Sequence, residues 1–169
     1  MRPIENLVLH PLTNFDIIKI VKGENILPGL YPPKKFKIKY FSGVFMKDEL
    51  PLKTKKVECG IINLQNLNEA GSHWTAYYKS SYKYYFDSYG NTHPPKELVK
   101  YLGKDNLFYN EERIQNYDDP PICGHLCILI LKAFSEHFPH ITPLIYESII
   151  TDVMNYKKIM YNKYAISKY

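Results

Sequence analysis

The sequence has no long apolar segment, few cysteines and almost no arginine. No hydrophobic run reaches the roughly 18 residues that a membrane span needs, and the N-terminus, MRPIENLVLHPLTNF, lacks the unbroken apolar stretch of a signal peptide. We therefore expect a protein that is neither secreted nor bound in a membrane. Three cysteines, Cys59, Cys123 and Cys127, are too few and odd in number for a disulfide framework. Free thiols in a reducing compartment are expected.

The composition is that of a globular protein with a basic surface. A length of 169 residues suits a single domain spanning residues 1–169, and 45% of the residues are hydrophobic. The net charge is +5, and among the 22 basic residues only Arg2 and Arg113 are arginines. Lysine acts as a flexible point charge toward phosphate, so the composition fits weak, non-specific contact with a polyanion such as DNA. A strand over FKIKYF (36–41) would set Lys35, Lys37 and Lys39 on one face, either as a polyanion patch or simply as a solvated face.

The hydrophobic patterns predict helices at both ends and strands in the middle. A first helix is capped by Thr13 or Asn14 and ends before Gly23. Three strand patterns with short turns between them predict an antiparallel meander. The remaining patterns predict two short elements and two long helices. The strands are expected at 59–65, 73–79 and 82–90, with a helix at 94–104, a strand at 106–110, and helices at 123–138 and 143–160. The fold class is therefore α+β, with a mixed, mostly antiparallel central sheet flanked by helices.

The segment DDPPICGHLC brings Cys123 to the first turn of a buried helix. Unsatisfied N–H groups and the helix dipole favour an anion there, and they lower a thiol pKa from about 8.5 into the range of about 3.5–7.5. Pro120 and Pro121 stiffen the approach, and Gly124 lets another backbone or a substrate come close. Cys127, one turn later among apolar residues, is expected in the core. The pattern indicates that Cys123 is a nucleophile.

A thiolate nucleophile needs a general base, and the base needs an acceptor that orients it. His73 opens the strand HWTAYYK, and Asp87 lies near the end of the next strand, YKYYFDSYG. A tight hairpin would bring the two to one end of the sheet. The other histidines lack such a partner and are expected to lie on the surface or in the packing; they are His10, His93, His125, His137 and His140.

The tetrahedral intermediate of acyl transfer needs donors for its oxyanion. The backbone N–H of Cys123 is one candidate, and the amide of Gln115, on the segment that leads to Cys123, is the second. A residue that only anchors the loop would also explain Gln115, and the neighbouring Asn116 competes for the role of donor.

The ordered series GSHW, YYFDSYG, Q and CGHLC resembles the adenovirus-type maturation cysteine proteases, the adenain-like enzymes related to the ubiquitin-like-protein-specific proteases. Versions carried by virophages and Polinton or Maverick elements are the most similar, over about residues 10–140. The resemblance implies a papain-like core of the adenain type, with His73 as base, Asp87 as its acid, Gln115 as oxyanion donor and Cys123 as nucleophile. Adenovirus enzymes have Glu in place of this Asp, a slightly shorter spacing from Gln to Cys and a longer C-terminal region.

The resemblance also implies a biological role. We expect a cysteine endopeptidase that processes viral capsid and virion precursor proteins at Gly-containing sites, as a monomer, inside the virion and at the assembly site in the host cell. No metal or other cofactor is expected, although the relatives' stimulation by DNA makes activation by DNA an expectation here.

Two other functions are compatible with the sequence, and a third is disfavoured. The same chemistry could act on ubiquitin-like modifiers of a host, or the protein could be a non-catalytic, basic DNA-binding or scaffold protein of the virion. A metal knuckle of Cys123, His125 and Cys127 is disfavoured, because this spacing on a helix points the side chains in different directions and no second ligand pair follows.

Overall fold

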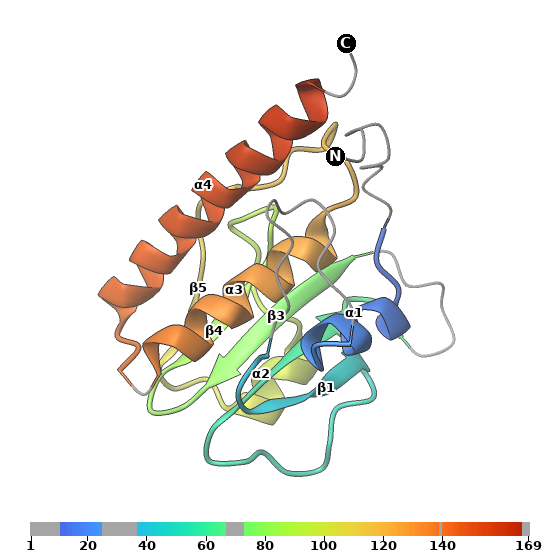
Figure 1. Cartoon of the computed structure of the whole chain (residues 1–169). Helices are drawn as coiled ribbons and strands as arrows, with labels where there is room; N and C mark the ends of the chain where they lie inside the picture. Colours follow the sequence, from blue (N-terminus) through green and yellow to red (C-terminus); the bar gives the residue numbers. More distant parts are fainter. Residues whose placement is uncertain (1–10, 25–36, 67–72, 139, 167–169) are drawn as a thin grey trace.

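The computed structural model describes residues 11–24, 37–66, 73–138 and 140–166, with side chains up to Lys158. These residues form five strands around which four helices pack (Figure 1). In chain order the elements are α1 (Asn14–Val21), β1 (Phe41–Met46), β2 (Glu58–Asn63), β3 (Trp74–Lys79), β4 (Lys83–Phe86), α2 (Lys96–Leu102), β5 (Leu107–Tyr109), α3 (Cys123–His137) and α4 (Pro143–Ile166).

The sheet is mixed, with strand order β1-β2-β3-β4-β5. The central pairs β2–β3 and β3–β4 are antiparallel, and the edge pairs β1–β2 and β4–β5 are parallel. The antiparallel meander predicted from residues 59–90 is therefore the centre of the sheet. The α+β prediction is confirmed, and the two edge strands make the sheet more evenly mixed than predicted.

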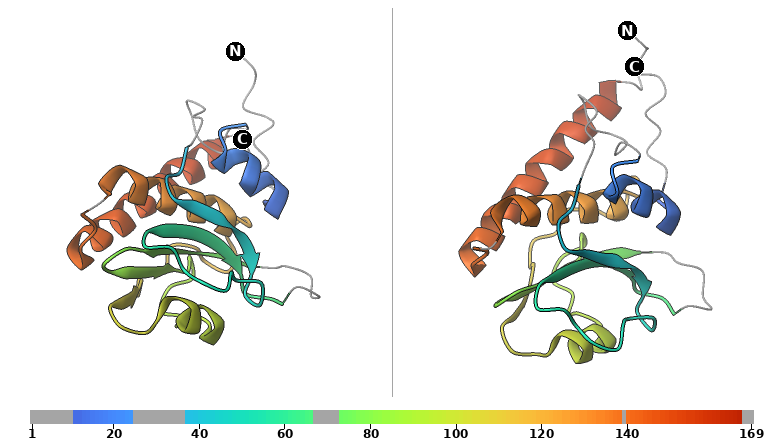
Figure 2. Two further views of the ribbon diagram at one scale, coloured as in Figure 1. Left: turned by 90° about the horizontal axis from the view of Figure 1, so that it is seen from below. Right: turned by 60° about the horizontal axis from the view of Figure 1, so that its bottom comes forward.

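Helices cover both faces of the sheet, in layers that are visible from below in Figure 2. α3 packs against β3, with α4 and α1 on the same side, and α2 lies on the opposite face. The alternation of side chains along the strands divides the tyrosines between two cores. Tyr78 and Tyr84 belong to the large core beneath α3, whereas Tyr77 and Tyr85 belong to a smaller core that includes Leu98 of α2.

The first helix begins as predicted. Thr13 caps α1, because its hydroxyl accepts a hydrogen bond from the N–H of Asp16 at 3.2 Å and its own N–H donates to the Asp16 carboxylate at 2.9 Å. This reciprocal pair gives hydrogen-bond acceptors to two backbone N–H groups that the helix itself leaves without a partner. Farther along, α3 matches the buried helix predicted at 123–138, and α4 continues to Ile166, six residues beyond its predicted end.

The strand predicted at 36–41 is wrong. Lys39 and Tyr40 form a turn, and β1 starts only at Phe41. Tyr40 has a φ of 59°, which is left-handed and incompatible with an extended strand. The N–H of Lys39 instead donates to the Ser135 hydroxyl at 3.0 Å. Lys37 and Lys39 therefore do not share a strand face, and Lys35 lies outside the described residues.

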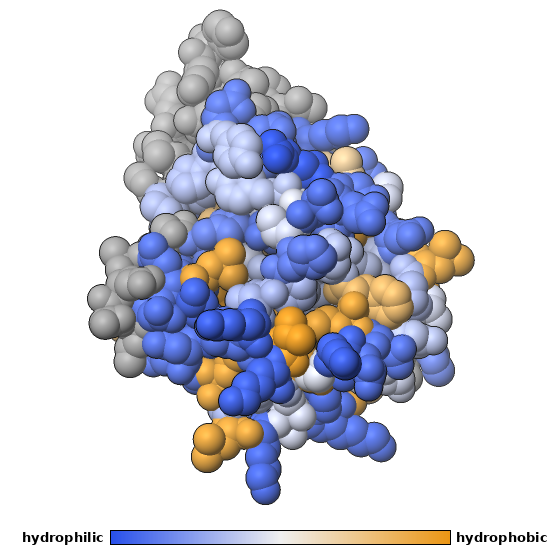
Figure 3. Space-filling view, turned by 180° about the vertical axis from the view of Figure 1, so that it is seen from behind, coloured by the Kyte–Doolittle hydropathy of each residue, from blue (hydrophilic) through white to orange (hydrophobic). Residues whose placement is uncertain are grey.

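The surface is mainly hydrophilic on the face shown in Figure 3, where hydrophobic side chains form small, separate patches. Within the described part of the chain, no helix combines the length and the apolar character needed to cross a membrane.

Candidate active site

The end of the β3–β4 hairpin brings His73 and Asp87 together. His73 directly precedes β3, and Asp87 directly follows β4. The register pairs Ala76 with Phe86, so its continuation sets Asp87 diagonally across from His73 on the same face. Side chains in diagonal positions are within reach of each other. The Nε2 atom of His73 lies 2.8 Å from Oδ1 of Asp87.

Asp87 is buried and fully hydrogen-bonded. Only 3% of the residue is exposed. Besides His73, its Oδ1 accepts the N–H of Tyr89 at 2.9 Å, and its Oδ2 accepts the hydroxyl of Thr92 at 2.8 Å. Burial would raise the pKa of Asp87, but the hydrogen bond and charge of His73 and the bonds from Tyr89 and Thr92 outweigh it and hold the pKa below its usual value. The side chain is therefore a carboxylate at neutral pH.

Asn110, just beyond β5, fixes the backbone of Asp87. Its Oδ1 accepts the N–H of Asp87 at 3.0 Å, and its Nδ2 donates to the carbonyl of Asp87 at 2.8 Å. An amide side chain thus replaces the backbone partner where the β4–β5 ladder ends, and β4 stops at Phe86 rather than at residue 90 as predicted. Sequence reasoning missed Asn110, since a lone Asn after a short strand has no distinguishing signal.

Cys123 is the first residue of α3 and lies against His73. The His73 side chain and the backbone N–H groups of Trp74 and Gly124 act on the Cys123 thiol and lower the thiol pKa. Because Nε2 of His73 is bonded to Asp87, the nitrogen that faces the sulfur is Nδ1. Neither a capping side chain nor an acidic residue occupies the first turn of α3, so the dipole of the helix acts on the thiol.

The electrostatics favour charge separation between Cys123 and His73. Burial would raise the pKa of Cys123, but the His73 side chain and the two N–H groups lower it below its usual value. Burial would likewise lower the pKa of His73, but Asp87 and Cys123 outweigh this and raise it to about 9. Both shifts favour a thiolate next to an imidazolium at neutral pH.

Ser88, the residue after Asp87, holds Gln115 in place. Gln115 is 2% exposed, its Oε1 accepts the hydroxyl of Ser88 at 2.7 Å, and its Nε2 donates to the carbonyl of Pro120 at 3.2 Å. The carbonyl can only accept, which sets the orientation of the amide. Nε2 carries two N–H groups, so a second N–H is left to donate. Asn116 is exposed, and it contributes its backbone N–H to the Asp119 carboxylate at 2.7 Å.

The remaining cysteines and histidines lie apart from this chemistry. Cys59 and Cys127 are free and buried, and burial raises the pKa of each thiol. His125 is fully buried, neither ring nitrogen has a hydrogen-bond partner, and burial lowers its pKa to about 4. The other described histidines, His93, His137 and His140, are exposed, and His10 lies outside the described residues.

Cys123, His125 and Cys127 do not form a metal site. Among residues 11–24, 37–66, 73–138 and 140–166, no three side chains of His, Cys, Asp or Glu lie together so that they could hold a metal ion.

Comparison with known proteins finds similar chains among the solved structures. No family model matches the chain, and no curated protein matches its sequence. The chain is similar to the crystal structure of the selenomethionine ASFV pS273R protease, with 16% identity, a TM-score of 0.45, and coverage of 94% of this chain and 69% of the other.

Proposed function

We propose that the protein is a cysteine protease, a thiol endopeptidase. The observation that carries the proposal is the His73–Asp87 pair, joined at 2.8 Å, together with Cys123 at the start of a helix, where His73 and Cys123 shift each other's pKa toward the charged forms. A nucleophile, a base and an acceptor that orients the base are the parts that covalent catalysis by a thiol requires. Gln115, with its amide orientation set by Ser88 and Pro120, is the proposed side-chain donor to the oxyanion.

In the proposed mechanism the Cys123 thiolate attacks the scissile carbonyl carbon. The oxyanion that forms accepts hydrogen bonds from the Cys123 N–H and from the amide of Gln115. The His73 imidazolium then gives its Nδ1 proton to the leaving amine as the C–N bond breaks, which leaves an acyl-enzyme. Neutral His73 takes a proton from water, the hydroxide attacks the thioester, and the thiolate leaves. Asp87 holds the ring and stabilises its charge throughout.

The proposed cleavage at glycine-containing sites rests on the sequence resemblance. At the start of α3, the indole Nε1–H of Trp74 donates to the carbonyl of Leu12 at 2.9 Å. A Cβ added to Gly124 would lie 3.2 Å from the Trp74 ring and 3.3 Å from Leu12, so Gly124 allows these two side chains to pack closely beside Cys123.

The proposed substrates are viral capsid and virion precursors, cut during assembly in the host cell and in the virion. This assignment rests on the sequence resemblance. A protease of ubiquitin-like modifiers is the alternative within the same chemistry. We further propose that the enzyme acts as a monomer and without a metal.

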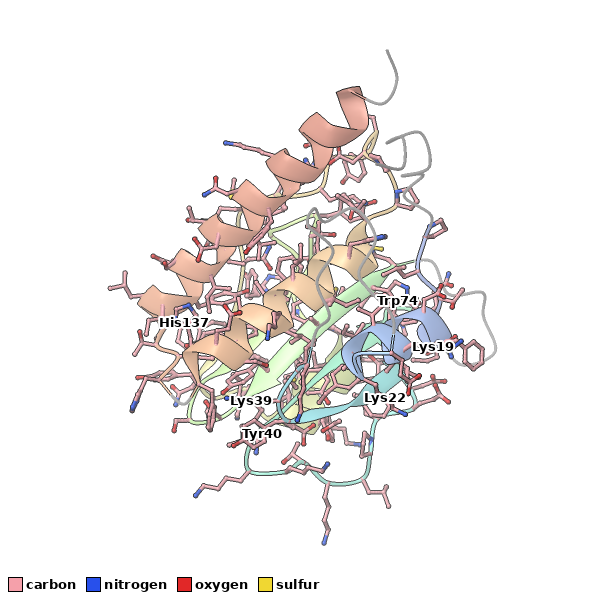
Figure 4. All side chains as sticks on the ribbon, in the orientation of Figure 1. Lys19, Lys22, Lys39, Tyr40, Trp74 and His137 are labelled. Carbon is pink, nitrogen blue, oxygen red and sulfur yellow. The ribbon has the colours of Figure 1, made fainter. Side chains whose placement is uncertain are left out.

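A basic end of the sheet supports contact with DNA. The register places Glu58 opposite Lys79, and Lys79 opposite Lys83, so these residues lie at the end of the sheet away from His73. Figure 4 shows Trp74 near the start of α3, and Lys39 and His137 toward its other end. The exposed lysines of this end are Lys39, Lys53, Lys55, Lys56, Lys100 and Lys104, with Asp105 and Glu136 as nearby exposed acids. Such a surface fits a phosphate backbone without reading its sequence.

Incubation with a peptide library rich in Gly-Gly and Gly-X sites, with and without DNA, tests the proposal. Mass spectrometry should find cleavage that is lost in Cys123→Ala and retained in Cys59→Ala. A higher cleavage rate with DNA would support activation of the enzyme by DNA bound at the basic end. Absence of cleavage in every condition, together with equal iodoacetamide labelling of Cys123 and unfolded-state thiols, would refute the protease and favour a DNA-binding or scaffold protein.

A further inference from the structure

Three consecutive residues, Asp87, Ser88 and Tyr89, contact both the proposed base and the proposed oxyanion donor. Asp87 bonds to His73. The hydroxyl of Ser88 donates to the Gln115 side-chain oxygen at 2.7 Å, and the carbonyl of Ser88 accepts the backbone N–H of Gln115 at 2.8 Å. The N–H of Tyr89 donates to the Asp87 carboxylate at 2.9 Å. The Tyr89 ring has no part in the mechanism described above, although it lies directly on the base.

The ring of Tyr89 stacks on the ring of His73, with centroids 4.8 Å apart and an interplanar angle of 29°. At this separation an aromatic face attracts a cation held over it, and the pair also packs favourably when it is neutral. The titratable groups that face His73 are therefore Asp87 at the end of β4, Cys123 at the start of α3, and Tyr89 against the ring plane.

The opposite side of Tyr89 is braced by the loop that carries Gln115. Tyr117 stacks on Tyr89 with centroids 5.2 Å apart and an angle of 25°. The guanidinium of Arg113 lies 4.6 Å from the centroid of the Tyr117 ring, and its Nε donates to the carbonyl of Tyr89 at 3.1 Å. The order His73, Tyr89, Tyr117, Arg113 is thus a continuous stack, which we name the aromatic stack. Tyr117 is 77% exposed, so the brace reaches the surface.

We propose that Tyr89 is a positioning residue for His73, which fixes the plane of the imidazole and stabilises its charged form, with Tyr117 and Arg113 as the brace. The inference rests on the proposed function of His73 as a base. The ring hydroxyl is not needed for this role, whereas the ring itself is.

The test compares Tyr89→Leu, which removes the ring, with Tyr89→Phe, which keeps it. NMR titration of the His73 ring in the full chain should give a pKa about 0.5–1 unit lower in Tyr89→Leu, which is about a 3- to 10-fold change in the proton affinity. With a peptide that the wild type cleaves, kcat should fall about 5- to 20-fold with little change in KM. Tyr89→Phe should match the wild type in both measurements.

Tyr40→Leu is the matched control, because Tyr40 also stacks on an aromatic ring, Phe138 at 4.8 Å, but at the other end of the sheet. It should leave the His73 pKa and kcat unchanged. Tyr117→Leu removes the brace at an exposed position and should cause a smaller loss, of about 2- to 5-fold in kcat. This variant tests the stack even where Tyr89→Leu does not fold.

An unchanged His73 pKa in Tyr89→Leu, or an equal loss in Tyr89→Phe, would overturn the proposal. So would wild-type behaviour of Tyr117→Leu where Tyr89→Leu is unfolded. The NMR comparison between variant and wild type is decisive whether or not a peptide is cleaved. Failure of the proposed function would appear separately, as a wild-type protein in which the pKa of His73 is not raised and Cys123→Ala has no effect on cleavage.

Discussion

Each end of the sheet buries a carboxylate, but the two carboxylates have different partners. At one end Oδ1 of Asp87 pairs with the imidazole of His73, and His73 in turn lowers the pKa of the Cys123 thiol. At the other end Oε1 of Glu58, fully buried, accepts hydroxyl hydrogens from Tyr77 at 2.8 Å and from Tyr101 at 2.6 Å.

Both carboxyl groups are satisfied by hydrogen bonds, as buried polar groups must be. Only Asp87 is connected to a base and a nucleophile. Burial of a carboxylate therefore does not identify a catalytic site, whereas the titratable partners of the carboxylate do. At the other end, the bonds of Glu58 link β2 to Tyr77 of β3 and to Tyr101 of α2. The exposed lysines of the basic end lie at this same end of the sheet.

Loss of the nucleophile should have the largest effect. Cys123→Ala removes the sulfur and is expected to abolish cleavage, by about 10³-fold or more. The Tm should change little, because the substitution deletes one small atom at the start of a helix. Peptide cleavage and thermal unfolding, measured on the same preparation, check both statements. Retained cleavage would refute the assignment of Cys123.

The pair Asp87→Asn and Glu58→Gln breaks the comparison directly. Asp87→Asn removes the charge that stabilises the imidazolium, so kcat/KM should fall by about 10²- to 10⁴-fold with a modest change in stability. Glu58→Gln weakens the bonds to Tyr77 and Tyr101, and it should cost roughly 1–3 kcal/mol of unfolding free energy while kcat/KM stays unchanged. Loss of folding in Asp87→Asn with loss of activity in Glu58→Gln would show that the two ends had been assigned the wrong roles.

Two histidines should make stability decline on both sides of neutral pH. The pKa of His73 is raised to about 9, so its contribution is fully present below about 6.5 and is lost as the pH rises through 9. The pKa of His125 is lowered to about 4, so the unfolded state binds a proton first and stability falls as the pH drops from about 6.5 toward 4. On the alkaline side, the raised pKa values of Cys59 and Cys127 add to the decline, and the lowered pKa of Cys123 opposes it. Thermal unfolding across pH 4–10 measures both slopes, and His73→Ala should change the alkaline slope without removing it. An alkaline slope identical to that of the wild type in His73→Ala would contradict this explanation.

His125→Leu should have the smallest effect, and it should stabilise the protein. Both ring nitrogens of His125 are buried without a partner, and an unsatisfied buried polar group costs about 1–3 kcal/mol. The variant is expected to gain about 1 kcal/mol and to lose the acid slope, with cleavage unchanged. The exposed His137 offers a matched control, since His137→Leu should change neither quantity. If His125→Leu is instead destabilised, the fit of the imidazole ring to the core outweighs the cost of its unpaired nitrogens.

Local patterns predicted much of the fold. The cap at Thr13, the strands of the meander and the helix from Cys123 all follow from residue types and periodicity within short windows. The hairpin then brings His73 and Asp87 together, because strand register is a local property once the turn is short.

What could not be predicted depends on contacts between distant segments. The parallel pairing of β1 with β2 and the left-handed Tyr40 have no signal within a short window of sequence, and the N–H of the neighbouring Lys39 donates to Ser135 near the end of α3. Gln115 and Asn116 are adjacent amides, and only the contact with Ser88 distinguishes them. Asn110 and the aromatic stack are likewise tertiary features without a sequence pattern.

The most direct test of the account is the pH dependence of Cys123 alkylation. Iodoacetamide reacts with the thiolate, so the rate at Cys123, followed by peptide mass spectrometry, reports its ionisation. A thiolate paired with His73 should already react at its full rate at pH values well below about 8.5, and Asp87→Asn should move this transition to higher pH. A rate that rises only through the pH range of an ordinary thiol, equally in the wild type and in Asp87→Asn, would contradict the ion pair on which the proposed function depends.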